Sequence, residues 1–359
     1  MSKINGPINV VRLEGIVMGQ DKVLYLFFDI HNDIFQQTKC EDFDNIDIGQ
    51  FFQKELSTIT SPIDFFMEIA PEEFGFYKNI HQIDRYFFEI RKFFLQNFNK
   101  KKDNNVRFHY VDVRDYTHIL KIAPELYQVI IKLNEETFLT EENISFIQKL
   151  INNLIVHYKK ILNLDKEKTY SKTEKEQLMK IMVKIHHVYN IQENKTILIK
   201  IYDYFIKRVR DLLQMMQTLQ TLFESYIKTY KTTIKDSLDI LYKIKLLNLE
   251  IKTSTLNTFL LLMDIYMIRR FVDKSYIKNG IVYAGAHHCV NYIYILVRYF
   301  NMKITHSVYS SIPIDKLNKK ILSFDSAYNV SYCSELEDFL YDPSWSQCVD
   351  LKGFPKPLF

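Results

Sequence analysis

The sequence contains few of the residues that cross-link a chain or interrupt regular secondary structure. Its 359 residues include eight glycines, eight prolines and four cysteines. The cysteines show no Cys-x-x-Cys spacing, which excludes a zinc-finger signature and a dense disulfide framework. We therefore expect a chain that folds in a reducing, intracellular setting.

Neither sign of charge dominates the sequence. Lysine and arginine number 47 and aspartate and glutamate 43, which gives a formal net charge of +4. Without a basic excess, binding to the phosphate backbone of a nucleic acid is not indicated. The lysine-rich stretch at 99–103 has no interleaved aromatic residues and is interpreted as a solvated loop. We expect no nucleic-acid partner.

The sequence also lacks a long hydrophobic run and a secretory leader. Its start, MSKINGPINVVRLEG, does not show the basic-then-apolar pattern of a signal peptide. The best candidate for a membrane span is TFLLLMDIYMIRRF, which Asp264 and Arg269 interrupt. A span needs about 18 apolar residues, so we expect no membrane span and a soluble protein.

What the sequence does contain is hydrophobic residues, at 47%, many of them in short β-prone runs. Between about residues 8 and 120, the apolar runs VLYLFFDI, IDFFMEI and VRFHYVDV alternate with the amphipathic stretches IGQFFQKEL and IDRYFFEIRKFFLQNF. Strand, helix, strand, helix, strand is typical of a parallel sheet. Strands that are apolar at nearly every residue indicate helices on both faces. The pattern predicts an α/β fold with a mostly parallel sheet flanked by helices.

The middle of the chain has a different pattern. From about 122 to 275 apolar residues recur at helical spacing, with no glycine and with one proline, Pro124. After Asn279 the α/β character returns, and from about 312 the sequence predicts irregular structure and a packed tail. We therefore predict three parts: residues 1–121 and 279–359 as the two halves of an α/β domain, and residues 122–278 as a large all-helical insertion.

Polar, titratable residues end four of the predicted strands. In open α/β sheets ligands bind at the carboxyl ends of parallel strands, so these residues are candidates for a site. The candidates are Asp29 and His31 after the first strand, Glu68 after the second, Arg114 after the third, and His287 or His288 after the fourth.

Each candidate also has a structural interpretation. His31 fits a turn or capping role, and Glu68 needs a partner or exposure whatever its function. Arg114 and Asp112 lie on the same side of a strand and fit a structural ion pair. Of His287 and His288, one is expected to point inward and the other outward.

Together these residues can support hydrolysis in two ways. Imidazoles and carboxylates could hold a divalent metal ion that activates water, with His31, Glu68 and His288 as its ligands. Without metal, a histidine could act as general base beside stabilising acids. In either case Arg114 could anchor a substrate carboxylate or phosphate, or clamp one of the site's own carboxylates.

The order of the motifs resembles that of the superfamily that joins ChaN-like haem-associated proteins, erythromycin esterases and TIKI/TraB-like proteases. The ChaN-like motif Gly-Glu-x-His-Asp-Asn corresponds to FDIHND at residues 28–33, and IDFFMEI resembles the family's strand that ends in glutamate, here Glu68. AGAHH resembles the late Gly-x-x-His, which selects His288 over His287. The resemblance implies an esterase or metalloprotease-like hydrolase with a small-molecule or peptide substrate, and haem as a further cofactor to test.

Two positions depart from this family pattern. Phe28 replaces glycine, which excludes a backbone conformation reserved for glycine. Asp29 replaces glutamate and is shorter by one methylene, which shifts the carboxylate by roughly 1 Å or more. These departures leave a second hypothesis open, in which a catalytically inactive chain keeps the fold and binds a viral or host protein through its helical region.

The whole chain, including the closing QCVDLKGFPKPLF, also resembles uncharacterised proteins of large DNA viruses that infect protists. This resemblance implies a location in the host cytoplasm or in the virion, and it brings no known activity with it.

Overall fold

The structure, a computed structural model, forms two compact units. The first comprises residues 1–112 and 264–359, and the second comprises residues 113–263. The residues that the structure describes are 3–30, 37–69, 85–97, 105–114, 118–133, 140–163, 196–230, 234–324 and 334–359.

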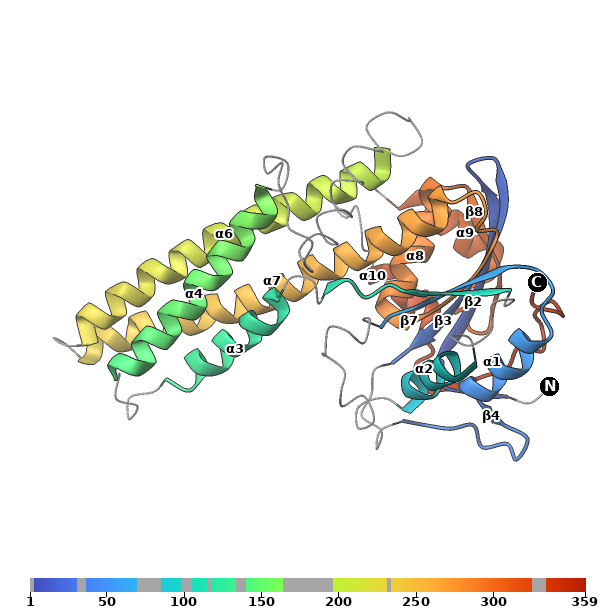
Figure 1. Cartoon of the computed structure of the whole chain (residues 1–359), viewed down its shortest axis with the longest axis horizontal. Helices are drawn as coiled ribbons and strands as arrows, with labels where there is room; N and C mark the ends of the chain where they lie inside the picture. Colours follow the sequence, from blue (N-terminus) through green and yellow to red (C-terminus); the bar gives the residue numbers. More distant parts are fainter. Residues whose placement is uncertain are drawn as a thin grey trace. The chain divides into compact units, whose positions relative to one another are not determined.

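The described part of the first unit contains a six-stranded mixed sheet in the order β6–β5–β7–β3–β2–β8 (Figure 1). Its strands are β2 (Asn9–Val17), β3 (Gln20–Asp29), β5 (Ile63–Met67), β6 (Val106–Tyr110), β7 (Asn279–Gly285) and β8 (Met302–Ser307). β6, β5, β7 and β3 run parallel, whereas β2 is antiparallel to both β3 and β8. The predicted mostly parallel sheet is confirmed, with an antiparallel edge that the sequence pattern did not predict.

The β2–β3 hairpin builds this antiparallel edge. Val17 pairs with Gln20 across a two-residue turn in which Met18 and Gly19 have φ angles of 54° and 74°. Positive φ at both central positions is the turn geometry that matches the twist of the two strands. β2 and β8 mix buried and exposed residues, while Leu24 to Phe28 of β3 are fully buried. The edge strands thus face solvent in part, and the parallel centre is covered on both sides.

An aromatic core lies between one face of the sheet and two helices, α1 (Ile48–Ser57) and α2 (Arg85–Asn97). The ring centroid of Phe52 in α1 lies 5.0 Å from that of Phe27 and 4.9 Å from that of Phe65. Phe94 of α2 lies 4.5 Å from Phe65. Alternate residues of a strand point to the same face, so Tyr25 and Phe27 reach this core together.

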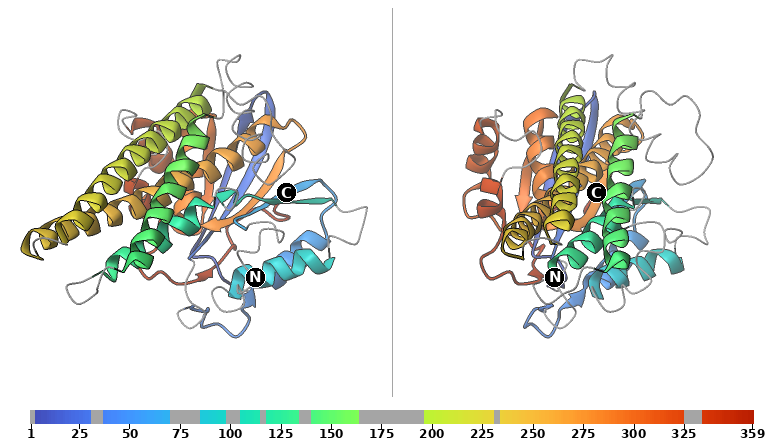
Figure 2. Two further views of the ribbon diagram at one scale, coloured as in Figure 1. Left: turned by 60° about the vertical axis from the view of Figure 1, so that its left-hand side comes forward. Right: turned by 90° about the vertical axis from the view of Figure 1, so that its left-hand side faces the viewer.

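The other face of the sheet is covered by α8 (Ala286–Tyr299), which contacts β3, β7 and β8 (Figure 2). Two shorter helices, α9 (Ile314–Ser323) and α10 (Ser334–Leu340), pack against α8. The prediction of irregular structure from about residue 312 is therefore wrong in part. α9 buries Leu317 and Ile321, which the i, i+4 spacing of an amphipathic helix places on one face.

The regular elements described in the second unit are helices, and α7 continues into the first unit. They are α3 (Ile119–Ile131), α4 (Glu141–Leu162), α6 (Thr196–Tyr230) and α7 (Ile234–Asp273). α4 packs against both α3 and α6. The division between the units falls within α7, before Asp264, so an insertion with limits at 122 and 278 stays a prediction. None of the helices described is both long and apolar enough to cross a membrane.

A buried lysine side chain from β3 binds the C-terminal end of α7. Nζ of Lys22, in β3, donates to the carbonyl oxygens of Phe271, Lys274 and Ile277 at 2.6–2.8 Å. The last carbonyls of a helix have no partners within it, and Lys22 binds one of them, that of Phe271, at the negative end of the helix dipole. Lys274 and Ile277 lie just beyond the helix, so the ammonium group also holds the segment that follows it. Lys22 is only 1% exposed, and burial lowers its pKa to about 8.

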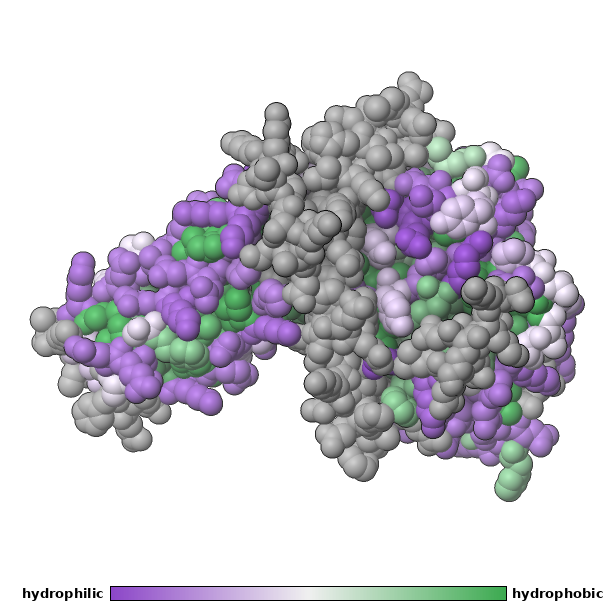
Figure 3. Space-filling model, viewed as in Figure 1, coloured by the Kyte–Doolittle hydropathy of each residue, from purple (hydrophilic) through white to green (hydrophobic). Residues whose placement is uncertain are grey.

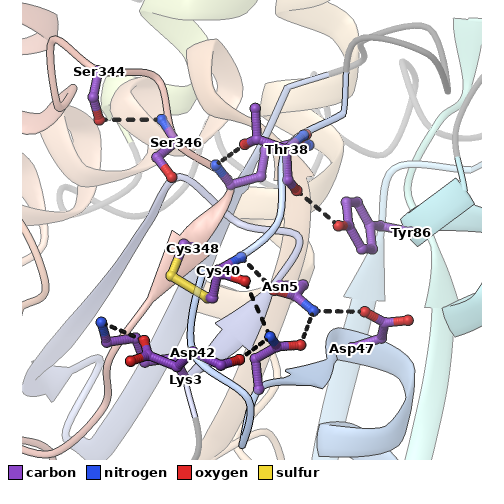
Figure 4. Close-up of a disulfide and its surroundings, with 12 residues drawn as sticks. Lys3, Asn5, Thr38, Cys40, Asp42, Asp47, Tyr86, Ser344, Ser346 and Cys348 are labelled. Atoms are coloured by element: carbon purple, nitrogen blue, oxygen red, sulfur yellow. Dashed lines mark hydrogen bonds and ion pairs between the residues drawn. A yellow bond between two sulfur atoms is a disulfide. The ribbon is translucent and has the colours of Figure 1, made fainter.

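A second, three-stranded sheet ties the two ends of the chain together (Figure 4). β1 (Ile4–Asn5) pairs with β4 (Ile46–Asp47) and with β9 (Cys348–Val349). A disulfide joins Cys40 to Cys348, and the side-chain oxygen of Asn5 accepts the backbone N–H of Cys40 at 2.8 Å. The disulfide departs from the expectation of a chain whose cysteines stay reduced. The sequence could not indicate the pair, because cysteines 308 positions apart show no spacing pattern.

The disulfide also fixes the C-terminal tail against the aromatic core. Beyond Cys348, the side chains of Leu351, Phe354 and Leu358 are buried in that core. The hydroxyl group of Tyr25 donates to the carbonyl oxygen of Leu358 at 2.7 Å. The tail therefore completes a core whose other members come from residues 4–106 and from Ile281 and Tyr283 of β7.

We expect reduction of the disulfide to lower stability. A cross-link between distant residues restricts the unfolded chain, and its loss typically costs about 2–5 kcal/mol. Dithiothreitol should lower the melting temperature of the wild type and leave that of a Cys40→Ser/Cys348→Ser double variant unchanged. A wild-type melting curve that does not respond to the reductant, or the absence of a Cys40–Cys348 linked peptide in non-reducing mass spectrometry, would contradict the pairing.

Candidate functional site

Parallel strands bring polar groups together at one edge of the sheet. Asp29 ends β3, where the register pairs it with Gly285 at the end of β7, and its Oδ1 accepts the hydroxyl group of Tyr283 at 2.8 Å. Glu68 follows β5, and its backbone N–H donates to the carbonyl oxygen of Tyr283 at 3.1 Å. Because carboxyl ends of parallel strands share one edge, both carboxylates lie where α8 begins.

His288, in the first turn of α8, is held between two carboxylates. Its Nδ1 lies 2.5 Å from Oδ1 of Asp264, and its Nε2 lies 3.3 Å from Oε1 of Glu68. His288 and Glu68 are 3% and 6% exposed, and Asp264 is fully buried. Asp264 belongs to the part of α7 that lies in the first unit. The imidazole is thus fixed between a strand end and a neighbouring helix.

Both carboxylates around His288 have additional hydrogen-bond donors. The backbone N–H of Gly285 donates to Oε2 of Glu68 at 2.7 Å. Gly285 is the N-cap of α8, so this carboxylate satisfies a free amide and lies at the positive end of the helix dipole. Nδ2 of Asn291, one turn further along α8, donates to Oδ2 of Asp264 at 2.8 Å. Each buried charge in this cluster is therefore hydrogen-bonded, as its burial requires.

The carboxylates keep His288 positively charged at neutral pH. Burial by itself would lower the pKa of His288, but Glu68 and Asp264 outweigh burial and raise the pKa to about 9. Burial, with the nearby charges of Glu68, Asp29 and Asp264, raises the pKa of the Cys289 thiol well above its ordinary value. The site can therefore donate a proton or stabilise negative charge through His288, and Cys289 remains an unreactive thiol.

The structure treats the predicted site residues differently. It brings Glu68 and His288 into contact and places Asp29 at the same edge of the sheet. His31 lies outside the described residues. Arg114 is half-buried near the start of the second unit, so its role as substrate anchor or clamp stays a prediction.

The neighbouring histidine points away from the cluster. The side chain of His287 is 39% exposed, and its Nδ1 lies 3.4 Å from Oε1 of Glu337 in α10. Successive residues of a helix are separated by about 100° around its axis, so only one of the two can face Glu68. In this structure that residue is His288.

Two side chains of the His288 cluster were missed at the level of sequence. Asp264 was noted only as a break in the run TFLLLMDIYMIRRF, and Asn291 was assigned to a helix without a role. The signal for Asp264 was present, because a carboxylate inside a strongly apolar helix must find a partner when the helix is buried. No sequence pattern identifies that partner as His288, since the two side chains meet through tertiary packing.

Metal binding finds no support in the described residues, which contain no group of three or more His, Cys, Asp or Glu side chains arranged to hold a metal ion. The predicted ligand set included His31 with Glu68 and His288, and His31 is not described. In the described set, His288 uses both ring nitrogens for carboxylates. A protonated ring cannot ligate a metal, so binding there would require His288 to lose a proton first.

A second histidine cluster lies on the same sheet and has the opposite protonation state. Nε2 of His109 lies 2.6 Å from Oδ1 of Asp64, and Nε of Arg270 donates to Nδ1 at 3.1 Å. An Nδ1 that accepts a hydrogen bond carries no proton, so His109 is neutral. Burial lowers the pKa of His109, and the neighbouring Arg270 lowers it further. Arg107, which also binds Asp64, completes this network.

Comparison with known proteins gives a family and viral relatives. A family model described as a family of unknown function, DUF5847, matches residues 2–359. The chain belongs to this family. It is 29% identical to uncharacterized protein R706 of Acanthamoeba polyphaga mimivirus, over 98% of this chain and 96% of that protein. It is also 27% identical to uncharacterized protein R161 of the same virus, over 99% of this chain and 97% of the relative.

These matches support the predicted resemblance to proteins of a large DNA virus, and they cover nearly the full chain. No solved structure matches the chain. None of these matches is a ChaN-like protein, an erythromycin esterase or a TIKI/TraB-like protease.

The charged state of His288 predicts a specific pH dependence of stability. Folded His288 has a pKa of about 9, above the ordinary 6.5, so its contribution is complete below pH 6.5 and is lost as pH rises toward 9. Between pH 6.5 and 8 the free energy of unfolding should fall by roughly 1.5 kcal/mol from this group. Denaturant melts at fixed temperature across this range measure the slope.

Above pH 8, Lys22 has the opposite effect, because its lowered pKa makes the folded state gain stability as pH rises. The test therefore ends at pH 8. His287→Gln should keep the wild-type slope, and His288→Gln and Glu68→Gln should each reduce it. An unchanged slope in both of the latter variants would show that His288 is not the group responsible.

Proposed function

We propose that this protein is a hydrolase that activates water with a histidine–carboxylate site at the carboxyl edge of its sheet. The observation that carries the proposal is His288, buried and charged between Glu68 and Asp264 at the same sheet edge as Asp29. Groups with strongly shifted pKa values gather at functional sites more often than elsewhere. The proposed substrate is a small-molecule ester or a peptide.

The geometry around His288 supports a division of roles. Asp264 binds Nδ1 and so fixes the direction of the ring, as the buried acid of a catalytic triad does for its histidine. Nε2 then faces Glu68 at 3.3 Å, a separation longer than an ideal hydrogen bond. In the proposed reaction His288 donates a proton or stabilises a developing oxyanion, His31 is the base, and Asp29 and Glu68 are its carboxylate partners.

The ChaN/erythromycin esterase/TIKI-like resemblance adds support through one motif. In the Gly-x-x-His pattern, Gly285 caps α8 and donates its N–H to Glu68, and His288 follows three residues later. That spacing puts the imidazole in the first turn of the helix, above the same carboxylate. Gly285 and His288 of this motif thus both contact Glu68, so the spacing of the motif sets two contacts to one carboxylate.

A second candidate function is a catalytically inactive viral protein that binds a viral or host partner, in the virion or in the host cytoplasm. Burial favours it, because Glu68, Asp264 and His288 are each less than one-tenth exposed. Such a network also stabilises a fold without any reaction. The ring of Phe28, where the family pattern has glycine, is fully buried and packs against Tyr341, which follows α10, at 6.4 Å between centroids.

A panel of ester and peptide substrates tests the first proposal. We expect hydrolysis by the wild type and a loss of about 10²–10⁴-fold in kcat/KM for His288→Gln, the usual contribution of a positioned acid or base. His287→Gln is the matched control and should keep wild-type activity, because it changes the same residue type outside the cluster. Assays after chelation, with and without Zn²⁺ or Mn²⁺, decide whether a metal takes part, and a haem titration followed at the Soret band tests haem.

Circular dichroism must accompany the assay, since His288→Gln leaves two buried carboxylates without their counter-charge. His31→Ala provides an independent variant that leaves Glu68, Asp264 and His288 unchanged, and it should lose the same activity. Activity that persists in folded His288→Gln and His31→Ala proteins would refute the assigned roles. A folded wild type that hydrolyses no member of the panel, yet retains a viral or host protein when all five predicted residues are replaced, would favour the binding function.

A further inference from the structure

Helix α7 is apolar on two separate faces within the second unit. One face is buried in that unit, where Thr255 bonds to the hydroxyl group of Tyr158 in α4 at 2.8 Å and Phe259 contacts Phe205 in α6 at 5.7 Å between centroids. Leu241, Ile244 and Ile251 are buried on the same face. With the buried Asn248 between Ile244 and Ile251, these residues recur at intervals of three and four, as expected for the seam of a helical bundle.

The other apolar face of α7 is exposed. Tyr242, Leu246, Leu249 and Leu256 are 64%, 51%, 44% and 48% exposed. With Thr253, which is exposed, and Leu260, which is half-buried, they form a row that we call the α7 stripe: Tyr242, Leu246, Leu249, Thr253, Leu256 and Leu260. At about 100° per residue, the stripe is centred on the order of 140° around the helix from the buried face. It is therefore a distinct surface.

The spacing within the α7 stripe is regular. Its members follow one another at intervals of 4, 3, 4, 3 and 4 residues. This is the a/d repeat of a coiled coil, in which Leu246, Thr253 and Leu260 take a positions and Tyr242, Leu249 and Leu256 take d positions. Over this stretch the stripe is roughly 27 Å long at 1.5 Å per residue. Figure 3 shows hydrophobic patches on a largely hydrophilic surface over helices of this unit.

The charges beside the stripe select the occupant. In a parallel pair of helices, a residue at position g faces the residue at position e of the next heptad on the other helix. Lys245 is at g and Glu250 is at e, five residues later, so two copies of this helix would form two Lys245–Glu250 pairs. Within the described residues neither side chain makes an ion pair or hydrogen bond, and both remain available.

The same charges disfavour an antiparallel pair. An antiparallel arrangement that covers the whole stripe sets g against g and e against e. It would place Lys252 opposite Lys252 of the other copy and Glu250 near its own counterpart, and Lys245 would have no carboxylate opposite it. Like charges in such positions repel, whereas the parallel arrangement pairs opposite charges.

We propose that the α7 stripe is the contact between two copies of this chain, which associate as a parallel two-stranded coiled coil. The inference does not depend on the proposed hydrolase function, because it uses residues of the second unit alone. It assigns a second copy, rather than an unrelated protein, to the face that α7 leaves uncovered.

Sedimentation of the full-length chain tests the association. We expect the wild type to sediment with twice the mass of one chain at micromolar concentrations. Leu249→Glu should raise the dissociation constant at least about 100-fold, because one buried leucine per copy is lost. Lys207→Glu on α6, an exposed residue outside the stripe, is the matched control and should leave the dimer intact. A monomeric wild type, or a Leu249→Glu variant that remains dimeric, would overturn the proposal.

Charge reversal and cross-linking test the orientation. Lys245→Glu and Glu250→Lys should each weaken the dimer by about 5-fold, and the double reversal should restore it, since each symmetric pair contributes modestly. Thr253→Cys should cross-link to itself on oxidation, because equivalent a positions meet only in a parallel pair. Its absence, together with cross-linking of a Leu249→Cys/Thr253→Cys mixture, would show an antiparallel dimer instead.

Other occupants of the stripe would give different results. A wild type that stays monomeric but sediments with anionic phosphatidylserine vesicles, and loses this binding in Leu249→Glu, would assign the stripe to a membrane surface. That outcome would also overturn the proposal. Melting curves of every variant, compared with the wild type, show whether a change in mass reflects the surface or a loss of folding.

Discussion

The insertion of β7 between β3 and β5 is the constraint on which the rest of the first unit depends. β7 begins more than 200 residues after β5, yet it pairs in parallel with both β3 and β5 and lies between them. The pairing joins β5 and β3 into one sheet, satisfies backbone groups along both of these strands, and places Gly285 beside Asp29. Without it, Glu68 would have no helix terminus to bind and His288 no strand end to approach.

The entry of α7 into the first unit distributes buried charges along that sheet. Asp264, early in this part of the helix, binds His288 at the carboxyl edge, and Arg270, six residues later, binds His109. Lys22 then donates to the carbonyl oxygen of Phe271 near the end of the helix and to that of Ile277 beyond it. Successive positions along α7 thus provide hydrogen-bond partners for His288, His109 and Lys22. The arrangement is costly to assemble from isolated parts, because each charge requires its partner to be in place.

His288 and His109 show how the same side chain is driven to opposite states by its neighbours. Both are buried, and burial alone disfavours the charged ring in each. His288 faces two carboxylates and is held as a cation. His109 shares its single carboxylate, Asp64, with Arg107 and also accepts a bond from Arg270, so it stays neutral. Because both rings are buried, the balance of local charge accounts for the difference between the two sites.

What the sequence by itself determined was the class of each strongly patterned element. The apolar runs that became β3, β5, β6 and β7, the amphipathic stretches of α1 and α2, and the long helices α4 and α6 all follow from local periodicity. Local order also indicated that Asp29 and Glu68 end strands, because a polar residue after an apolar run marks an edge. The hairpin strand β2 and the helices α9 and α10 carried weaker patterns and were missed.

Only the tertiary structure decided which of these residues meet. Asp264 and His288, Cys40 and Cys348, and Lys22 and the end of α7 are pairs without any spacing rule, since each joins elements that the chain brings together from distant positions. Local periodicity fixes the direction of a side chain relative to its own helix or strand. It does not determine which side chain lies opposite across the core. The contacts that set the charge of His288 and His109 are therefore known only from the assembled sheet.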